Sequence, residues 1–207
     1  MHIKDQLDAL IEELRFHDIN EDILNAMKKI KRHLFVLGKF KDEAYENRAL
    51  PLNHGSTISQ PYTVGFMLHE LELKKGLKVL EVGTGSGWNA ALIGYLVGKG
   101  RVYSTEVLPK IAEFAKENIK KVKIKNVKVF VGNILKERLF KEIKFDRIIV
   151  TAGAEEFPEE LLKMLKNNGI MLCPVGKETQ EMIKVWKKNG KIIKKNLGEF
   201  VFVKLEE

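Results

Sequence analysis

Residues 79–93, VLEVGTGSGWNAALI, decide the expected fold. A hydrophobic strand at 78–82 runs into the glycine-rich turn Gly83-Thr84-Gly85-Ser86-Gly87 and then directly into a helix over 88–97. The glycines let the backbone turn tightly and let a ligand approach the peptide planes. Because nucleotides bind at the end of such a strand in open α/β sheets, the stretch predicts a nucleotide-type cofactor site; the alternative is a purely structural glycine turn.

Strands and helices alternate downstream of this stretch. Strands are expected over 101–106, 127–131, 145–151 and 169–175, and helices over 109–119 and 158–165. Upstream, amphipathic helices are expected over 3–14 and, behind an Asn20 cap, over 21–31, with another over 62–71 that starts at Pro61. This alternation predicts a mostly parallel sheet covered on both faces, a doubly wound Rossmann-like α/β fold.

The C-terminal part has a different pattern. Residues 181–186 alternate, Asn189-Gly190 is a hairpin signal, and EFVFVKL at 199–205 alternates again, which predicts an antiparallel C-terminal edge strand. No repeat, low-complexity tract or linker interrupts the chain, so one domain is expected over 1–207. Within it we expect an N-terminal helical cover (1–50), a cofactor-binding core (51–175) and antiparallel strands (176–207).

Composition limits the partners. The 36 Lys and Arg residues exceed the 28 Asp and Glu residues, giving a formal charge of +8. One dense run, KENIKKVKIKNVK at 116–128, is typical of a solvated helix end, with nucleic-acid contact as the alternative. No secretory leader and no long apolar run is present, so a cytoplasmic location and no membrane partner are expected. Cys173 stands alone, which predicts a buried strand residue and no metal site.

Two carboxylates indicate which nucleotide binds. Glu106 ends the next strand, about 20 residues after the glycine turn, where a carboxylate can accept both hydroxyls of a ribose. The third glycine falls one residue too early for the dinucleotide pattern G-x-G-x-x-G. Glu81 would be unhelpful beside a pyrophosphate but suits the ammonium group of S-adenosylmethionine, directly or through water. Methyl transfer is therefore favoured; alternatively, Glu81 satisfies backbone groups and Glu106 is a surface group.

Four segments together resemble one family. They are LPLNHGSTISQP at 50–61, the glycine-rich stretch, FDRIIVTAGAEEFPEELLKMLKNNGIMLCPVG at 145–176, and the terminal FVFVKL. In this order and spacing they look like the protein-L-isoaspartate O-methyltransferases. The resemblance covers most of the chain from about Arg32 onward. The Thr-Ile-Ser-x-Pro segment is not a general feature of methyltransferases, so the resemblance is specific.

The resemblance implies a class I S-adenosylmethionine-dependent methyltransferase fold and a protein-repair activity. Such an enzyme moves a methyl group from S-adenosylmethionine, leaving S-adenosylhomocysteine, to the free carboxylate of L-isoaspartyl residues in damaged proteins and peptides. Carried over residue by residue, the resemblance makes Ser59 and Thr57 catalytic. It implies a cofactor site of Ser56, Ile58, Gly83, Thr84, Gly85, Ser86, Gly87, Glu106, Val107, Asn133 and Ile134, and substrate contacts at His54 and Gln180.

The chain departs from the family pattern at a few positions. Gly132-Asn133-Ile134 stands where the family usually has Gly-Asp-Gly. The amide oxygen of Asn133 can still accept a hydrogen bond from adenine but lacks the charge, and Ile134 restricts the backbone, so cofactor affinity is less secure than the fold. Ser56 replaces a residue that is commonly Gln, and Asn53 one that is commonly Gly. Either change could reshape the peptide groove.

The expected chemistry needs no general base. An isoaspartyl carboxylate is ionised at neutral pH and is its own nucleophile, so the enzyme has only to align one oxygen with the methyl group. Ser59 can donate to the other oxygen and Thr57 can fix the plane of the carboxylate. A covalent role for Ser59 is not expected, since no His/Asp relay is evident. His54 could be a bystander in its loop.

Two other functions stay open at this point: a methyltransferase acting on RNA or a small molecule, and a non-catalytic domain that binds S-adenosylmethionine or a partner protein. Against the first, the sequence has no Asn-Pro-Pro-aromatic motif and no basic stripe with interleaved aromatics. We therefore expect isoaspartyl proteins and peptides as partners, no nucleic acid, and a monomer.

Overall fold

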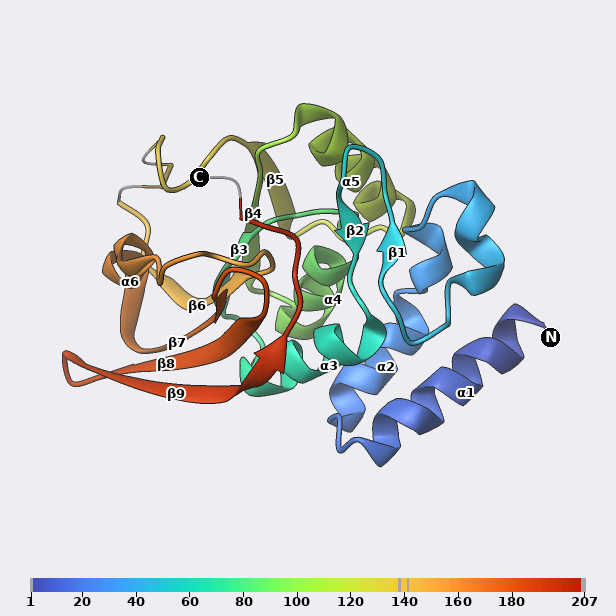
Figure 1. The fold of residues 1–207 in the computed structure, drawn as a ribbon, viewed down its shortest axis with the longest axis horizontal. Helices are drawn as coiled ribbons and strands as arrows, with labels where there is room; N and C mark the ends of the chain where they lie inside the picture. The colour runs from blue at the N-terminus through green and yellow to red at the C-terminus, as the bar shows by residue number, and fades with distance from the viewer. Residues whose placement is uncertain (1, 138, 141, 206–207) are drawn as a thin grey trace.

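A seven-stranded sheet forms the centre of the computed structural model, which describes residues 2–137, 139–140 and 142–205 (Figure 1). Its strands lie in the order β5 (Val127–Val131), β4 (Arg101–Glu106), β3 (Lys78–Val82), β6 (Phe145–Val150), β7 (Leu165–Val175), β8 (Gln180–Lys188) and β9 (Lys191–Phe200). Neighbouring strands from β5 to β7 are parallel, whereas β8 is antiparallel to both β7 and β9. The predicted fold class is confirmed.

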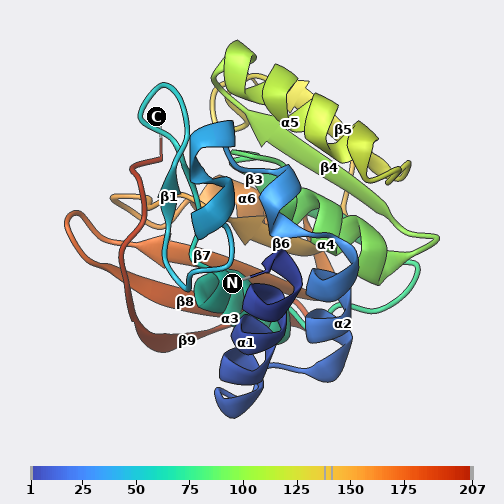
Figure 2. The ribbon, with the colours of Figure 1, turned by 90° about the vertical axis from the view of Figure 1, so that its right-hand side faces the viewer.

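Helices cover both faces of this sheet, as Figure 2 shows. They are α1 (Ile3–Phe16), α2 (Glu21–Lys29), α3 (Pro61–Glu70), α4 (Trp88–Val97), α5 (Pro109–Lys121) and α6 (Glu159–Met164). The Asn20 cap is confirmed, because its side chain accepts a hydrogen bond from the backbone N–H of Asp22 at 2.7 Å. In the described part of the chain, none of the helices combines the length and apolar character needed to cross a bilayer.

Alternate residues of the parallel strands supply two hydrophobic clusters. Val79 and Ile149 join the cluster that holds α1 to α4, whereas Leu80 and Ile148 join the cluster that holds α6. Successive side chains of a strand point to opposite faces, so nearly continuous apolar strands are required here. The larger cluster extends from α1 to β8, so the N-terminal helices share a core with the sheet.

The order of the strands creates a switch point beside β3. From β3 the chain passes to β4 and β5 on one side and then returns to β6 on the other side. At such a point the loops after the two central strands diverge and leave a crevice at their carboxyl ends. Gly83 follows β3 and Thr151 follows β6, so both lie at this crevice.

The C-terminal prediction is only partly correct. The hairpin at Asn189-Gly190 forms, but its second strand is β9, and residues 201–205 leave the sheet edge. They run across the carboxyl end of the sheet, where Gly153 donates to Val203 O and accepts from Leu205 N, both at 2.8 Å. The alternating side chains of 199–205 therefore belong mainly to this crossing segment. The predicted boundary between helix 158–165 and the next strand also shifts, since β7 already begins at Leu165.

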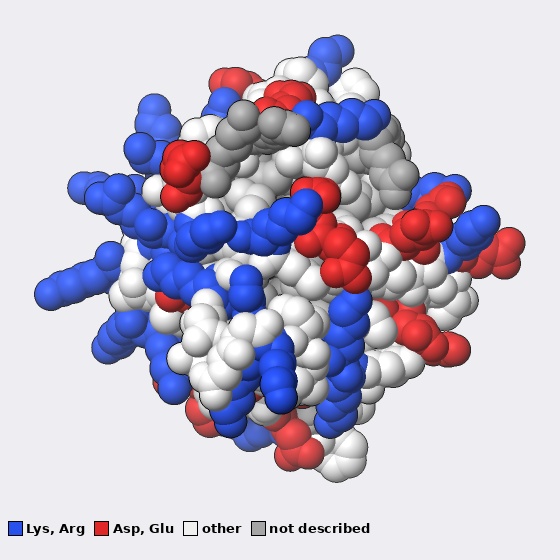
Figure 3. All heavy atoms as spheres, turned by 90° about the vertical axis from the view of Figure 1, so that its left-hand side faces the viewer, with Lys and Arg blue, Asp and Glu red and all other residues white. Residues whose placement is uncertain are grey.

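Positive charge gathers on one face of the molecule. Figure 3 shows lysines and arginines over the side that carries the β8–β9 hairpin, where Lys188, Lys191, Lys194 and Lys195 are exposed. Much of this grouping is local in the sequence, because KKNGKIIKK at 187–195 places five lysines in nine residues at the β8–β9 hairpin. Lys191, Lys194 and Lys195 lie on the edge strand β9, where lysines oppose pairing with another chain, so these three residues have a structural role. The run at 116–128 spans the end of α5 and the start of β5, with its lysines exposed.

Candidate active site

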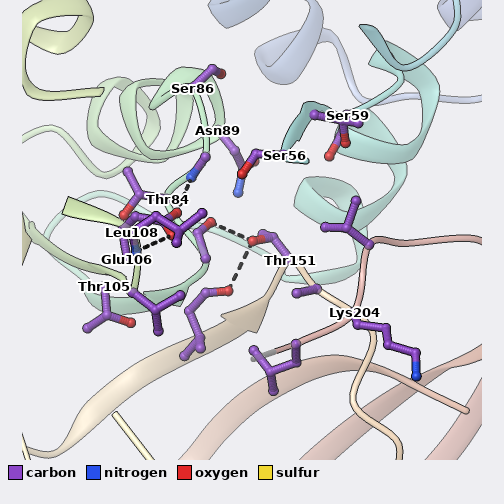
Figure 4. A pocket seen from close by; sticks show the side chains of 18 of the residues that line it. Ser56, Ser59, Thr84, Ser86, Asn89, Thr105, Glu106, Leu108, Thr151 and Lys204 are labelled. Atoms are coloured by element: carbon purple, nitrogen blue, oxygen red, sulfur yellow. Dashed lines mark hydrogen bonds between the residues drawn. The ribbon is translucent and has the colours of Figure 1, made fainter. Parts of the chain in front are cut away.

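A cavity of about 270 Å³ lies at the switch point, over the carboxyl ends of β3, β4 and β6 (Figure 4). One wall is the segment 54–59, which includes the short strand β2 (Thr57–Ile58); another is the crossing segment at 203–205. The volume is near the lower end of the range for small-molecule sites, about 300–1,000 Å³. The cavity therefore lies where the glycine-rich stretch predicts a cofactor.

Most of the predicted site residues line this cavity. Those that do are His54, Ser56, Thr57, Ile58, Ser59, Gly83, Thr84, Gly85, Ser86, Glu106, Val107, Asn133 and Ile134. Three predicted residues are not part of the lining: Glu81, Gly87 and Gln180. The structure thus brings the carried-over catalytic and cofactor residues to one place, although they come from distant parts of the chain.

The glycine turn is held by its neighbours on both sides. Backbone N–H groups of Gly83 and Thr84 donate to Thr105 O at 2.9 and 3.0 Å, which ties the turn to β4. The hydroxyl of Thr151 lies 3.0 Å from Val82 O and 2.5 Å from Gly83 O. Gly83 has φ 97°, and a Cβ there would lie 2.5 Å from Thr151 Oγ1. Only glycine therefore fits this turn.

Gly87 lies where the start of α4 packs against α5. Its φ is 85°, and a Cβ on it would lie 3.1 Å from Ala115 O in α5. The missing side chain lets α4 begin close against α5. Its neighbours Ser86 and Trp88 line the cavity and Gly87 does not, so its expected contact with the cofactor stays a prediction.

Glu106 is placed to bind a diol. Its carboxylate is 7% exposed and lines the cavity, with Oε2 accepting from Gly85 N at 2.9 Å and Oε1 from Leu108 N at 3.1 Å. Each oxygen thus accepts one backbone N–H and has further lone-pair capacity, because an ionised carboxylate offers about four acceptor positions. Two vicinal hydroxyls can use that capacity, so the residue fits the ribose of S-adenosylmethionine.

Glu81 is fully buried and does not reach the cavity. Its Oε1 accepts from Asn89 Nδ2 at 2.8 Å and its Oε2 accepts from Ser104 Oγ. Since the single hydroxyl proton of Ser104 is used in this way, Thr84 donates to Ser104 Oγ at 2.5 Å. Burial raises the pKa of Glu81 to about 7, against the hydrogen bonds from Ser104 and Asn89. Glu81 thus supports two cavity residues, Asn89 directly and Thr84 through Ser104. Its expected interaction with the ammonium group, directly or through water, stays a prediction.

The segment that carries Ser59 is anchored from behind. Strand β2 pairs with β1 (Leu50–Pro51), and the Ile58 side chain is buried in the core. At its other end, the carbonyl oxygen of Ser59 accepts from Arg32 Nη2 at 3.1 Å. The half-buried Ser59 side chain remains at the cavity wall. His54 lies in the exposed turn of this hairpin with φ 57°, on the rim of the cavity.

Asn133 and Gln180 are engaged within the protein. Asn133 Oδ1 accepts from Leu135 N at 2.9 Å, so the oxygen expected to face adenine also shapes its own turn. Gln180 is 1% exposed; its Oε1 accepts from Phe202 N at 2.8 Å and its Nε2 donates to Lys177 O at 2.9 Å. It holds the crossing segment and is not part of the cavity lining, so its expected place near the substrate cleft stays a prediction.

Several cavity residues were not foreseen from the sequence: Trp88, Asn89, Leu108, Thr151, Val203, Lys204 and Leu205. Thr151 could have been found, because it ends the strand next to β3. Lys204 and its neighbours could not, since the alternating pattern at 199–205 favoured a strand at the sheet edge. In the described part of the chain, no group of three or more His, Cys, Asp or Glu side chains could hold a metal ion.

Comparison with known proteins decides the family. The family model for protein-L-isoaspartate(D-aspartate) O-methyltransferase matches residues 5–207. The chain belongs to this family. It is 41% identical over 199 residues to the protein-L-isoaspartate O-methyltransferase of Fervidobacterium nodosum, covering 95% of this chain and 100% of that one. With the Pyrococcus horikoshii protein of the same name it shares 46% identity over 189 residues, covering 90% and 85%.

A solved structure agrees with these relatives. The chain superposes, with a TM-score of 0.86 and 32% identity, on a candidate protein-L-isoaspartate O-methyltransferase from Plasmodium falciparum in complex with S-adenosyl-L-homocysteine. The match covers 96% of this chain and 97% of that chain. These comparisons confirm the family resemblance, the enzyme class and S-adenosylmethionine as methyl donor, and favour isoaspartyl repair over action on RNA or a small molecule.

Proposed function

We propose that Ser59 and Thr57 of this protein-L-isoaspartate O-methyltransferase hold the acceptor carboxylate, and that the glycine turn and Glu106 hold S-adenosylmethionine. The observation that carries the proposal is that all these residues line one cavity at the switch point of the sheet (Figure 4). A single cavity lined by an uncharged hydroxyl wall and by a buried carboxylate suits two ligands, an anionic acceptor and a ribose.

The cofactor side uses groups that are fixed before any ligand binds. Glu106 would accept the ribose hydroxyls, because its two oxygens are held by Gly85 N and Leu108 N. The turn between Gly83 and Ser86 would receive the methionyl portion, and Asn133 and Ile134 would contact the adenine. When bound, S-adenosylmethionine supplies an electrophilic methyl group on a sulfonium. Pre-positioned groups lose little entropy on binding, so rigidity here supports affinity.

The acceptor side works by alignment. Ser59 would donate its hydroxyl proton to the carboxylate oxygen that does not attack, and Thr57 would fix the plane of the carboxylate. The other oxygen is left free to form the new O–C bond, while the pair of electrons of the breaking C–S bond stays on sulfur. A neutral donor orients the carboxylate without withdrawing its charge as a bidentate Arg would. His54 and the exposed rim of the hairpin would meet the flanking peptide.

Methyl transfer to matched peptides tests the activity. Peptides with isoaspartyl or normal aspartyl at one site are expected to differ, with labelling of the isoaspartyl form only. Ser59→Ala is expected to lower turnover far more than it weakens S-adenosylhomocysteine binding. Ser56→Ala serves as the matched comparison, because Ser56 is assigned to the cofactor and should change the dissociation constant instead. Equal labelling of both peptides would contradict the activity, and equal losses in Ser59→Ala would move Ser59 to the cofactor site.

We also propose that the chain acts as a monomer of one domain in the cytoplasm and does not bind nucleic acid. The shared core of α1 to α4 and the sheet supports one domain, and the lysines along β9 support a monomer because they oppose edge pairing. A fully buried single cysteine suits a reducing compartment. Light scattering would test the mass, and binding to RNA in rising salt would test the basic face in Figure 3.

A further inference from the structure

Arg32 is a buried cation directly behind the cavity wall. It lies in the 3-10 turn Arg32–Leu34 and has 0% exposure. Its guanidinium donates to three well-placed backbone carbonyl oxygens: Nη1 to Ala44 O at 2.7 Å, and Nη2 to Arg48 O at 2.9 Å and Ser59 O at 3.1 Å. The guanidinium carbon also lies 5.6 Å from the centroid of the Trp88 ring. Arg32 thus contacts two residues, Ser59 and Trp88, that line the cavity.

No ion pair compensates this charge among the residues that the structure describes. The Glu46 carboxylate is near enough to act on Arg32 but is paired with Arg48 Nε at 2.6 Å. Burial lowers the pKa of Arg32 to about 9, so the guanidinium is charged at neutral pH. By contrast, the buried Lys184 is paired with both Glu70 and Glu72 at 2.9 Å.

Burying a cation without an opposite charge lowers the stability of a protein, so its presence here indicates a functional role. Carbonyl dipoles relieve part of the desolvation penalty but leave the net charge in place. The acceptor of the reaction brings the missing opposite charge, since an isoaspartyl carboxylate must enter the cavity ionised. A cation behind the wall attracts that carboxylate without contacting it, so the attacking oxygen keeps its lone pairs.

We propose that Arg32 is a positioning residue that fixes Ser59 through its carbonyl oxygen and, by its uncompensated charge, favours an anionic acceptor in the cavity. The inference rests on the proposed role of Ser59. It predicts discrimination between two peptides of the same shape, one with the free isoaspartyl carboxylate and one with a carboxamide at that position.

Competition assays with these two peptides test the inference. The ratio of their affinities is measured for the wild type, Arg32→Gln, Arg32→Met and Arg32→Lys, together with the dissociation constant of S-adenosylhomocysteine. Arg147→Met is the matched control. Arg147 is also buried and also donates to backbone carbonyls, to Leu71 O at 2.6 Å and Glu72 O at 3.1 Å. It is absent from the cavity lining.

The ratio is expected to fall about tenfold in Arg32→Gln and Arg32→Met, as a nearby charge is removed. It should be kept in Arg32→Lys, in which kcat nevertheless falls because lysine cannot bridge the same carbonyls. Parallel weakening of both peptides in the neutral variants, or an equal drop of the ratio in Arg147→Met, would reduce Arg32 to a structural residue. If neither neutral variant folds, Arg32→Lys is the deciding variant, because it keeps the positive charge. A fall in its affinity ratio together with kcat would overturn the inference. If the wild type does not methylate the isoaspartyl peptide, the proposed function itself is refuted.

Discussion

Replacing Glu81 with glutamine is expected to change how the stability of the enzyme depends on pH. The carboxyl group is fully buried, and burial raises its pKa to about 7 from a usual value of 4.5. The folded protein therefore holds a proton on Glu81 over a range in which the unfolded chain has lost it. This contribution to stability is fully present below pH 4.5 and is lost as the pH rises to about 7.

The size of the effect follows from the two pKa values. One pKa unit corresponds to about 1.4 kcal/mol, so the gap between 4.5 and about 7 amounts to about 3 kcal/mol in the free energy of unfolding. Glutamine removes the titration while retaining one acceptor oxygen for Asn89 or Ser104. Relative to the wild type, Glu81→Gln should therefore gain about 2–3 kcal/mol between pH 5 and 8.

Urea unfolding at several pH values measures this difference directly. Subtracting the wild-type curve from that of the variant removes the titrations that both proteins share. Asp146→Asn is a control of opposite sign: burial raises the pKa of Asp146, but hydrogen bonds from Lys166 and from the backbone N–H of Lys78 outweigh this and lower it. Its contribution is present above its usual pKa and is lost on acidification. If the difference in the free energy of unfolding between Glu81→Gln and the wild type is constant or falls between pH 5 and 8, the raised pKa of Glu81 is refuted.

Two further predictions concern the loops around the cavity. Gly83→Ala should destabilise the enzyme by about 1–3 kcal/mol, because φ 97° strains alanine and its Cβ would lie 2.5 Å from Thr151 Oγ1. In urea unfolding, adding Thr151→Ala should recover part of this loss. A Gly83→Ala variant as stable as the wild type would contradict the geometry. Gln180→Ala should leave the N–H of Phe202 without its acceptor and lower the free energy of unfolding by about 1–3 kcal/mol. Amide hydrogen exchange should become faster at 201–205 but not in β7. Unchanged exchange at 201–205 would show that Gln180 does not hold this segment.

Local rules predicted the parts of the fold that depend on neighbours in the sequence. Asn20 caps α2, Pro61 starts α3, and the glycine turn joins β3 to α4, because each feature is decided by a few consecutive residues. The edge of the sheet was harder to predict. Strand β9 is exposed along most of its length, so it has little apolar alternation, whereas the crossing segment alternates but leaves the sheet.

The two halves of the cavity differ in the same way. The proposed cofactor half consists of one turn and the ends of adjacent strands, so spacing alone suggested Gly83 and Glu106, which both line the cavity. The acceptor half depends on contacts across the chain: Arg32 holds the carbonyl of Ser59, and Gln180 holds the segment that ends in the cavity wall. No pattern within one segment reports such contacts, since each partner alone is typical of a surface or a core position. Ser59 and Thr57 could be named from the family resemblance, whereas the contact between Arg32 and Ser59 appears only in the folded chain. The Arg32 variants test whether that contact takes part in substrate choice.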